Sequence, residues 1–461
     1  MGSATAAPGK AVVRRPLSRD VRLFWCASAT DALGSQASGV VLPLLLLGLG
    51  HSATTVGLVA GVSTAAGLLL APIAAVPADR GARKPVMLWS ALVSAFAMGG
   101  VAVAAAVGRP PLVLLLGAVL VERFSTAVYE AAAAGTVALI APPADSPRVV
   151  AGLSAADQGA LVLGPALGGA LYQASRALPF VADAVSYAVA AVCVGALKSD
   201  LRPGEGEAVF GGAAGSEGAA PGGAAKEPKR GAPGAQTLPD VQTLPGAQSP
   251  AGPRPSPPRR PALRAELGAG LALVRTSPFL RLVLIWTATV NGVIVALYYG
   301  AVFTLQKGGH GGAPMGLVLA LSGAAGLVGS LAAPHIAGRI SAARLLVTVS
   351  WLLVPLAAAL AAAKGPWAYG GLFGVFCLLM PLVTVVLQSR AIQETPPALQ
   401  ARTGAVLATA VGSSAALAPV VAGVCASRAG TAAPAVASAA VLTLLACWTT
   451  YGRVPARGVA V

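Results

Sequence analysis

Six ionisable residues stand inside long apolar segments of the chain, where a charge is costly. They are Asp31, Glu122, Arg123, Glu130, Asp157 and Asp183. At bilayer depth an ionisable group costs at least ~2.5–3.5 kcal/mol, so it usually faces a water-filled cavity or a partner of opposite charge. The chemistry open to these residues is therefore reversible protonation of a carboxyl group, or an internal ion pair.

Asp31 is the first candidate for a carboxyl group that takes up and releases a proton, and Glu122 and Arg123 are the next candidates for this proton-coupling site. The alternative for Asp31 is a carboxylate that only packs between helices. Glu122 and Arg123 are consecutive, about 100° apart on a helix, so we expect them to face different directions. Arg123 and Glu130 are seven residues apart and share a helical face. Arg123 is then either a cation near mid-membrane or one partner of an ion pair.

The segments around these residues are long enough to cross a membrane. The chain of 461 residues is 56% hydrophobic and only 10% charged, with a mean hydropathy of +0.76, whereas a soluble domain carries about 25% charged residues. A helix needs about 20 apolar residues to span the hydrocarbon core, and the weak alternation of membrane strands is absent. The predicted spans are 22–48, 55–77, 85–107, 112–138, 150–174, 179–197, 279–304, 315–337, 344–363, 367–388, 404–426 and 432–450. The sequence therefore predicts an all-α membrane protein with 12 transmembrane helices.

The distribution of charge decides the orientation. The net charge is +16, but the basic residues form short clusters between apolar runs, without the basic face or aromatic platform of a nucleic-acid binder. All but six of the 32 Lys and Arg residues fall on the side of the two termini. By the positive-inside rule we expect both termini in the cytoplasm and no nucleic-acid partner.

The residue types that serve enzymes and metal sites are sparse. Five cysteines lie in apolar segments, and neither they nor the three histidines form a zinc or disulfide pattern. A phosphate-binding loop is missing too, so ATP is not the energy source. We expect no enzymatic activity, no metal and no cofactor.

The chain divides into two halves. Residues 199–262 hold 12 of the 36 prolines and should form a disordered cytoplasmic linker. The linker separates a six-helix bundle at 22–198 from a region at 263–452. This second region begins with an amphipathic helix at 263–276 and continues as a second six-helix bundle. Cytoplasmic tails occupy 1–21 and 453–461. Arg148 and Pro165 are 17 residues apart, as are Arg402 and Pro419, so the bundles read as pseudo-repeats. Parallel repeats of six helices place a substrate site near mid-membrane, between the halves.

The loop after the second span resembles a motif of the major facilitator superfamily. The segment A-V-P-A-D-R-G-A-R-K at 75–84 is similar to the family pattern G-x-L-A-D-R-x-G-R-K. The matching residues are Asp79, Arg80, Arg83 and Lys84. The resemblance implies the major facilitator fold and a cytoplasmic gating latch, in which we expect Arg83 to pair with Glu130 and Asp79 to lie near Arg402–Gly404; a basic loop that only sets topology is the alternative.

A second motif lies in the fifth span. The run G-P-A-L-G-G at 164–169 is similar to the end of a motif associated with antiporters. Gly164 and Gly168 share a helical face and permit close helix contact, Pro165 distorts the helix, and Gly169 completes the pattern. Helix packing alone is the alternative to an antiport signature.

Further stretches resemble bacterial exporters that include macrolide and siderophore efflux proteins. They are L-G-S-Q at 33–36, F-V-A-D-A-V-S-Y at 180–187 and Q-E-T-P-P-A-L-Q-A-R at 393–402. The resemblance implies a monomeric, proton-coupled secondary transporter in the bacterial cytoplasmic membrane that expels hydrophobic or amphiphilic small molecules, as drug or metabolite exporters do. Asp183 matches an exporter acid, for which we expect a structural role, and Asp157 is expected near the membrane interface.

Two alternatives remain open: an uptake carrier or facilitator of the same fold, and a receptor or scaffold that transports nothing. The candidates for lining a substrate cavity are Trp25, Gln36, Phe124, Asn291 and Tyr298.

Overall fold

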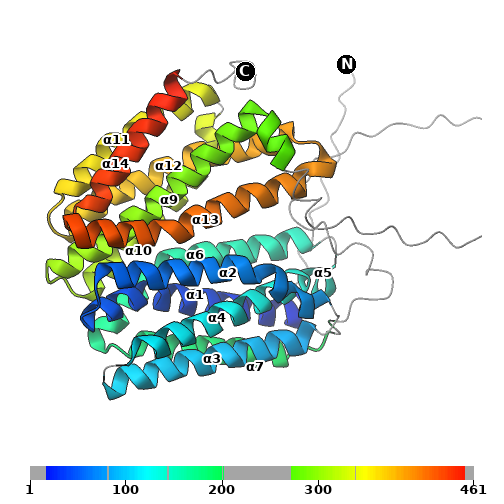
Figure 1. Cartoon of the computed structure of the whole chain (residues 1–461). Helices are drawn as coiled ribbons and strands as arrows, with labels where there is room; N and C mark the ends of the chain where they lie inside the picture. The colour runs from blue at the N-terminus through cyan, green and yellow to red at the C-terminus, as the bar shows by residue number, and fades with distance from the viewer. Residues whose placement is uncertain are drawn as a thin grey trace, which may run out of the picture.

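In the part of the chain that the structure describes, twelve long apolar helices form two groups of six; Figure 1 shows their arrangement. The computed structural model describes residues 17–79, 83–108, 110–142, 145–199, 201, 271–337 and 339–451. The N-terminal half consists of α1 (Arg19–Gly48), α2 (Ala53–Asp79), α3 (Arg83–Val107), α4 (Leu112–Ala134), α6 (Ser146–Ala174) and α7 (Leu178–Gly195). The C-terminal half consists of α9 (Pro278–Lys307), α10 (Gly312–Ala337), α11 (Ala342–Ala362), α12 (Pro366–Glu394), α13 (Pro397–Ala429) and α14 (Ala433–Tyr451). The prediction of an all-α fold with 12 transmembrane helices in two six-helix halves is confirmed.

Local sequence signals start the first helix of each half in the same way. Ser18 caps α1 by accepting a hydrogen bond from the Val21 amide at 3.2 Å, and Ser277 caps α9 by accepting from the Leu280 amide at 3.3 Å. A serine at this position satisfies an amide that the helix itself leaves unpaired. The two halves therefore share not only helix number but also the way in which each begins.

The two halves touch mainly along two pairs of helices, α2 with α13 and α6 with α10, and to a smaller extent where α1 meets α9 and α10. We call the side where α1 begins and α14 ends the terminal side, and the opposite one the distal side. At the distal side, the Thr54 hydroxyl donates to Ser427 Oγ at 2.9 Å, and the Ala313 amide donates to Gln173 Oε1 at 3.1 Å. In Figure 1 the helices of the two halves converge on this side and diverge towards the side where α1 begins. The contacts between the halves thus close the distal side.

The beginning of the predicted linker is fastened to the first helix. Asp20 Oδ2 accepts hydrogen bonds from the Lys198 amide at 3.1 Å, the Ser199 amide at 2.7 Å and the Ser199 hydroxyl at 2.5 Å. Leu201 is buried in the same cluster as Val21. Most of the linker, the tails at 1–16 and 452–461 and residues 263–270 of the expected amphipathic helix lie outside the described residues; 271–276 are helical.

We expect Asp20→Ala to destabilise this junction. A hydrogen bond to a charged group contributes about 1.5–3 kcal/mol, and the substitution leaves two backbone amides without their acceptor. The melting temperature of the detergent-solubilised protein should fall by several degrees, as size-exclusion chromatography after heating would show. Ser199→Ala, which removes only one donor, should have a smaller effect; an Asp20→Ala protein as stable as the wild type would contradict the role assigned to this carboxylate.

Candidate functional site

Glu122 is the centre of a polar network inside the N-terminal half. Its carboxylate accepts a hydrogen bond from the Tyr187 hydroxyl at 2.8 Å and from the Thr126 hydroxyl at 3.1 Å, both to Oε1. Its Oε2 lies 3.5 Å from Nε of Arg123. Glu122 is buried, whereas 45% of the Arg123 side chain is exposed. The two residues do point in different directions, as expected, yet their side chains are long enough to meet, so the ion pair of Arg123 is with its neighbour.

Asp183 is the most deeply buried acid of the described residues, at 1% exposure. The Ser186 hydroxyl donates to its backbone oxygen at 2.7 Å and lies 3.5 Å from Oδ1. A side chain at Gly34 would overlap Ser186 and come within 2.8 Å of Asp183 Oδ1, so the glycine lets α1 approach the acid. Within the described part of the chain, Oδ2 of Asp183 makes no hydrogen bond.

Asp31 is half-buried on α1, among other acids. The charges that act on it come from Asp183, Glu130, Glu122 and Asp157. The acids that the sequence spreads over four helices therefore lie within electrostatic reach of Asp31. Within the described part of the chain, no three His, Cys, Asp or Glu side chains are arranged to hold a metal ion.

Aromatic residues of the C-terminal half face this acidic region. Tyr298 and Tyr299 of α9 stack edge to face, with ring centroids 5.1 Å apart, and Phe303 follows at 6.2 Å from Tyr299. Tyr299 is close enough to Arg123 for the two to interact electrostatically across the halves. Asn291, two turns earlier on α9, is half-buried. The C-terminal half thus adds aromatic and uncharged polar groups opposite Arg123.

Two of the expected cavity residues instead pack helices together. Trp25 donates its indole N–H to the Val149 carbonyl at 3.1 Å, and its ring lies against Gly152 of α6. Gln36 packs against Gly164. Phe124 is 38% exposed and makes no ring contact within the described part of the chain. Trp25 and Gln36 are accounted for as contacts between α1 and α6.

The basic residues of the loop motif bind the ends of neighbouring helices. Nη1 of Arg83 donates to the Gly135 carbonyl, just beyond α4, at 2.7 Å, and Nζ of Lys84 donates to the Leu197 carbonyl, beyond α7, at 2.6 Å. The last carbonyls of a helix lack partners and carry a negative partial charge, so they attract cations. The expected ion pair of Arg83 with Glu130 is not formed here, because Arg83 binds this carbonyl instead. The Asp79 side chain and Arg80 lie outside the described residues.

The glycines of the second motif face two different helices. Gly164 and Gly168 pack against Gln36 and Ala37 of α1. Gly169 packs against Gly312 and Gly316 of α10, and a side chain at Gly316 would overlap the Pro165 carbonyl. The motif therefore lies where α6 is held between α1 of its own half and α10 of the other half.

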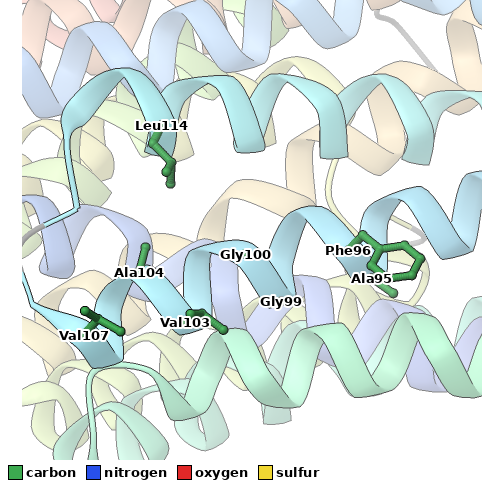
Figure 2. A pocket seen from close by; sticks show the side chains of 8 residues that line it. All are labelled: Ala95, Phe96, Gly99, Gly100, Val103, Ala104, Val107 and Leu114. Atoms are coloured by element: carbon green, nitrogen blue, oxygen red, sulfur yellow. The ribbon is translucent and has the colours of Figure 1, made fainter.

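An apolar groove of about 710 Å³ lies elsewhere, on the outer surface of α3 and α4 (Figure 2). Gly99 and Gly100 form part of its lining, and Leu114 of α4 points towards α3. Phe96, at its edge, is 79% exposed. This surface is where a membrane helix meets lipid chains, and the groove does not lie between the two halves.

Sequence reasoning missed the hydroxyl groups that hold the acids. Tyr187 and Ser35, 3.0 Å apart, and Thr126 belong to apolar helices, where a hydroxyl residue by itself predicts nothing. One signal was available: Tyr187 follows Asp183 by four residues and so shares its helical face.

Twelve helices of the described residues are long and apolar enough to cross a membrane, and they form two halves of six, which defines a polytopic membrane protein. The family model "Major Facilitator Superfamily" matches residues 24–419, and the chain belongs to this family. No curated protein matches the chain.

Solved structures share the fold over nearly the whole length. A bacterial homologue of the human lysosomal transporter Spinster, in an inward-facing and unoccupied conformation, is 12% identical with a TM-score of 0.65, covering 96% of this chain and 98% of that one. The nucleoside transporter NupG is 13% identical with a TM-score of 0.64, covering 94% and 99%. A bacterial homologue of the iron transporter ferroportin is 13% identical with a TM-score of 0.63, covering 95% and 99%. At such identities the likeness shows the fold alone.

Proposed function

We propose that this protein is a monomeric, proton-coupled exporter of hydrophobic or amphiphilic small molecules that works by alternating access. The observation that carries the proposal is the set of carboxyl groups within electrostatic reach of Asp31, opposite the tyrosines of α9. A carboxyl group held in a membrane interior is suited to binding and releasing a proton. Aromatic rings offer apolar surface together with a hydroxyl group, which suits an amphiphilic cargo.

The orientation follows from the basic residues. The terminal side is cytoplasmic by the positive-inside rule, so the closed distal side faces outwards. In this state the region between the halves opens to the cytoplasm, from which an exporter takes its cargo. The termini lie in the cytoplasm of a bacterium in this proposal.

The cycle assigns Asp31 the coupling proton. In the inward-facing state Asp31 releases its proton to the cytoplasm and cargo binds between the halves. After the halves rock to open the distal side, cargo leaves and Asp31 takes up a proton from outside. The Glu122–Arg123 pair changes the electrostatic potential at Asp31 during the cycle. Arg123 is exposed enough to turn from Glu122 towards the cargo. The loop residues Asp79, Arg80, Arg83 and Lys84, with Glu130, act as the cytoplasmic latch of the outward-facing state.

Inverted membrane vesicles test this function. Vesicles that contain the protein should accumulate ethidium, Hoechst 33342 or erythromycin when their interior is made acidic, and the accumulation should collapse when a protonophore removes the gradient. Vesicles without the protein are the control. Accumulation that needs the opposite gradient would indicate an uptake carrier, and accumulation that ignores the gradient would indicate a facilitator.

A further inference from the structure

A second pocket, of about 400 Å³, lies on the distal side where the two halves meet. The N-terminal half supplies the ends of α1 and α6 and the loop after α6, and the C-terminal half supplies the end of α9, the loop after it and the start of α10. The polar side chains of the lining are those of Tyr172, Gln173, Ser175, Arg176, Gln306 and His310. Hydrogen-bonding groups from both halves therefore surround one space, unlike the apolar groove on α3 and α4.

The pocket is formed by the close approach of α6 and α10. Gln173 Oε1, at the end of α6, accepts a hydrogen bond from the Ala313 amide at 3.1 Å. A Cβ atom at Gly312 would lie 2.9 Å from Cδ1 of Tyr172, so the glycine lets the start of α10 pack directly on α6. Opening of the distal side separates these two helix ends and removes one side of the lining. The complete pocket therefore belongs to the state in which the distal side is closed.

The loops on the distal side carry no negative charge. Aspartate and glutamate are absent from the sequence of these loops, which are 49–52, 108–111, 175–177, 308–311, 363–365 and 430–432. Arg176, the charged residue of the lining, forms no hydrogen bond and no salt bridge with the described residues. A guanidinium group binds phosphate through parallel N–H donors, and the first amides of α10 add a positive partial charge. The pocket therefore attracts an anion.

The pocket lies at the level of the membrane surface. α6 ends at Ala174 and α10 begins at Gly312, so the lining is found where the apolar spans stop and lipid headgroups begin. On the same two helices Leu167 and Leu317 are both 39% exposed and lie less than two turns from the lining. A lipid whose acyl chain packs against these leucines has its headgroup phosphate at the level of Arg176.

We propose that this pocket binds a phosphate group, either of an anionic phospholipid or of free phosphate, and that its occupancy holds the distal side closed. Arg176 supplies the charge, and the side-chain amides of Gln173 and Gln306 and the ring of His310 are further hydrogen-bonding groups. A ligand that binds one conformation better than another shifts the population towards that conformation. The proposal goes beyond export, because it needs neither a coupling proton nor a particular direction of transport.

Spin labels at the distal ends of α2 and α13 measure the closed state at the other pair of contacting helices, away from the pocket. The full-length protein is placed in nanodiscs of phosphatidylcholine, of phosphatidylcholine with phosphatidylglycerol, or of phosphatidylcholine in a buffer with inorganic phosphate. We expect at least one of the last two conditions to raise the ratio of closed to open protein by about threefold or more. A response to phosphatidylglycerol alone identifies the lipid headgroup as the ligand, and a response to inorganic phosphate shows that the free anion suffices.

Arg176→Gln removes the charge and keeps a hydrogen-bonding side chain, so the response should disappear. Arg176 is exposed, and its replacement should leave the fold intact. Lys364→Gln is the matched control, because it removes a cation of the same membrane face that does not line the pocket, and it should respond as the wild type does. A wild-type protein that responds to neither source of phosphate, or an Arg176→Gln protein that responds as strongly as the wild type, would overturn the proposal. Failure of gradient-driven export in vesicles would refute the proposed exporter and leave this site untouched.

Discussion

Asp31→Asn should reduce export driven by a pH gradient to the level of vesicles that lack the protein. Asparagine keeps the size and hydrogen-bonding capacity of the side chain but cannot take up a proton. Asp31 is half-buried among four other acids, so its charge cannot change without affecting the whole group. The measurement is uptake of ethidium or Hoechst 33342 into acidified inverted vesicles, with protein level checked by immunoblot.

Exchange of labelled cargo at equal pH on both sides should survive in this variant, because exchange needs no net movement of protons. Asp145→Asn is the control: Asp145 is an acid of the same half that lies at the start of α6 and is not one of the acids around Asp31. It should export at close to the wild-type rate. Full gradient-driven export by Asp31→Asn would move the coupling role to Glu122 or Glu130, or remove protons from the mechanism.

Gly169→Ala should prevent the distal side from closing and abolish most transport. A Cβ atom at this position would overlap the Gly312 carbonyl and lie 2.9 Å from Gly316 Cα. Both contacts are with backbone of the other half, which cannot turn away as a side chain can. Spin labels placed on the distal ends of α6 and α10 should report a longer distance than in the wild type.

Gly159→Ala provides the comparison on the same helix. A Cβ atom there would meet nothing within 4 Å, while the gain in helix propensity, about 1 kcal/mol, is common to both substitutions. Gly159→Ala should therefore transport normally. A Gly169→Ala protein with wild-type distances and wild-type transport would show that α6 and α10 need not come this close.

The sequence predicts the helices because membrane crossing imposes a length and a composition that few other structures share. Because every span must be apolar along its whole length, the composition does not reveal where a helix breaks or which neighbour each of its faces contacts. The short helix α5 (Val137–Ile140) lies at the end of the predicted fourth span, and no apolar pattern separates the two. The glycines at 164–169 signal close packing, but spacing alone did not reveal that Gly169 faces α10 while Gly164 and Gly168 face α1.

The sequence predicts which charged residues belong to the candidate site, but it does not predict which groups they bond to. Acids in apolar spans are conspicuous, so Asp31, Glu122 and Asp183 could be named from the sequence. The partner of Arg83 could not, since Glu130 and the Gly135 carbonyl lie near the same membrane face and only the geometry of the helix end decides between them. The roles of Tyr187 and Ser35 could not be predicted either, because serine in a membrane helix often bonds only to its own backbone carbonyls and the partner of a tyrosine hydroxyl depends on which helix packs beside it.

The ties at the terminal side of the N-terminal half bear on how the protein changes shape. Arg83 and Lys84, at the start of α3, bind the ends of α4 and α7, and Asp20, at the start of α1, binds the residues after α7. Four helices are thereby fastened to one another at one end by hydrogen bonds that do not involve the other half. We therefore expect the N-terminal half to turn as a rigid body. The two sides of the protein then open and close by sliding of α2 against α13 and of α6 against α10, where small residues let the helices move past one another.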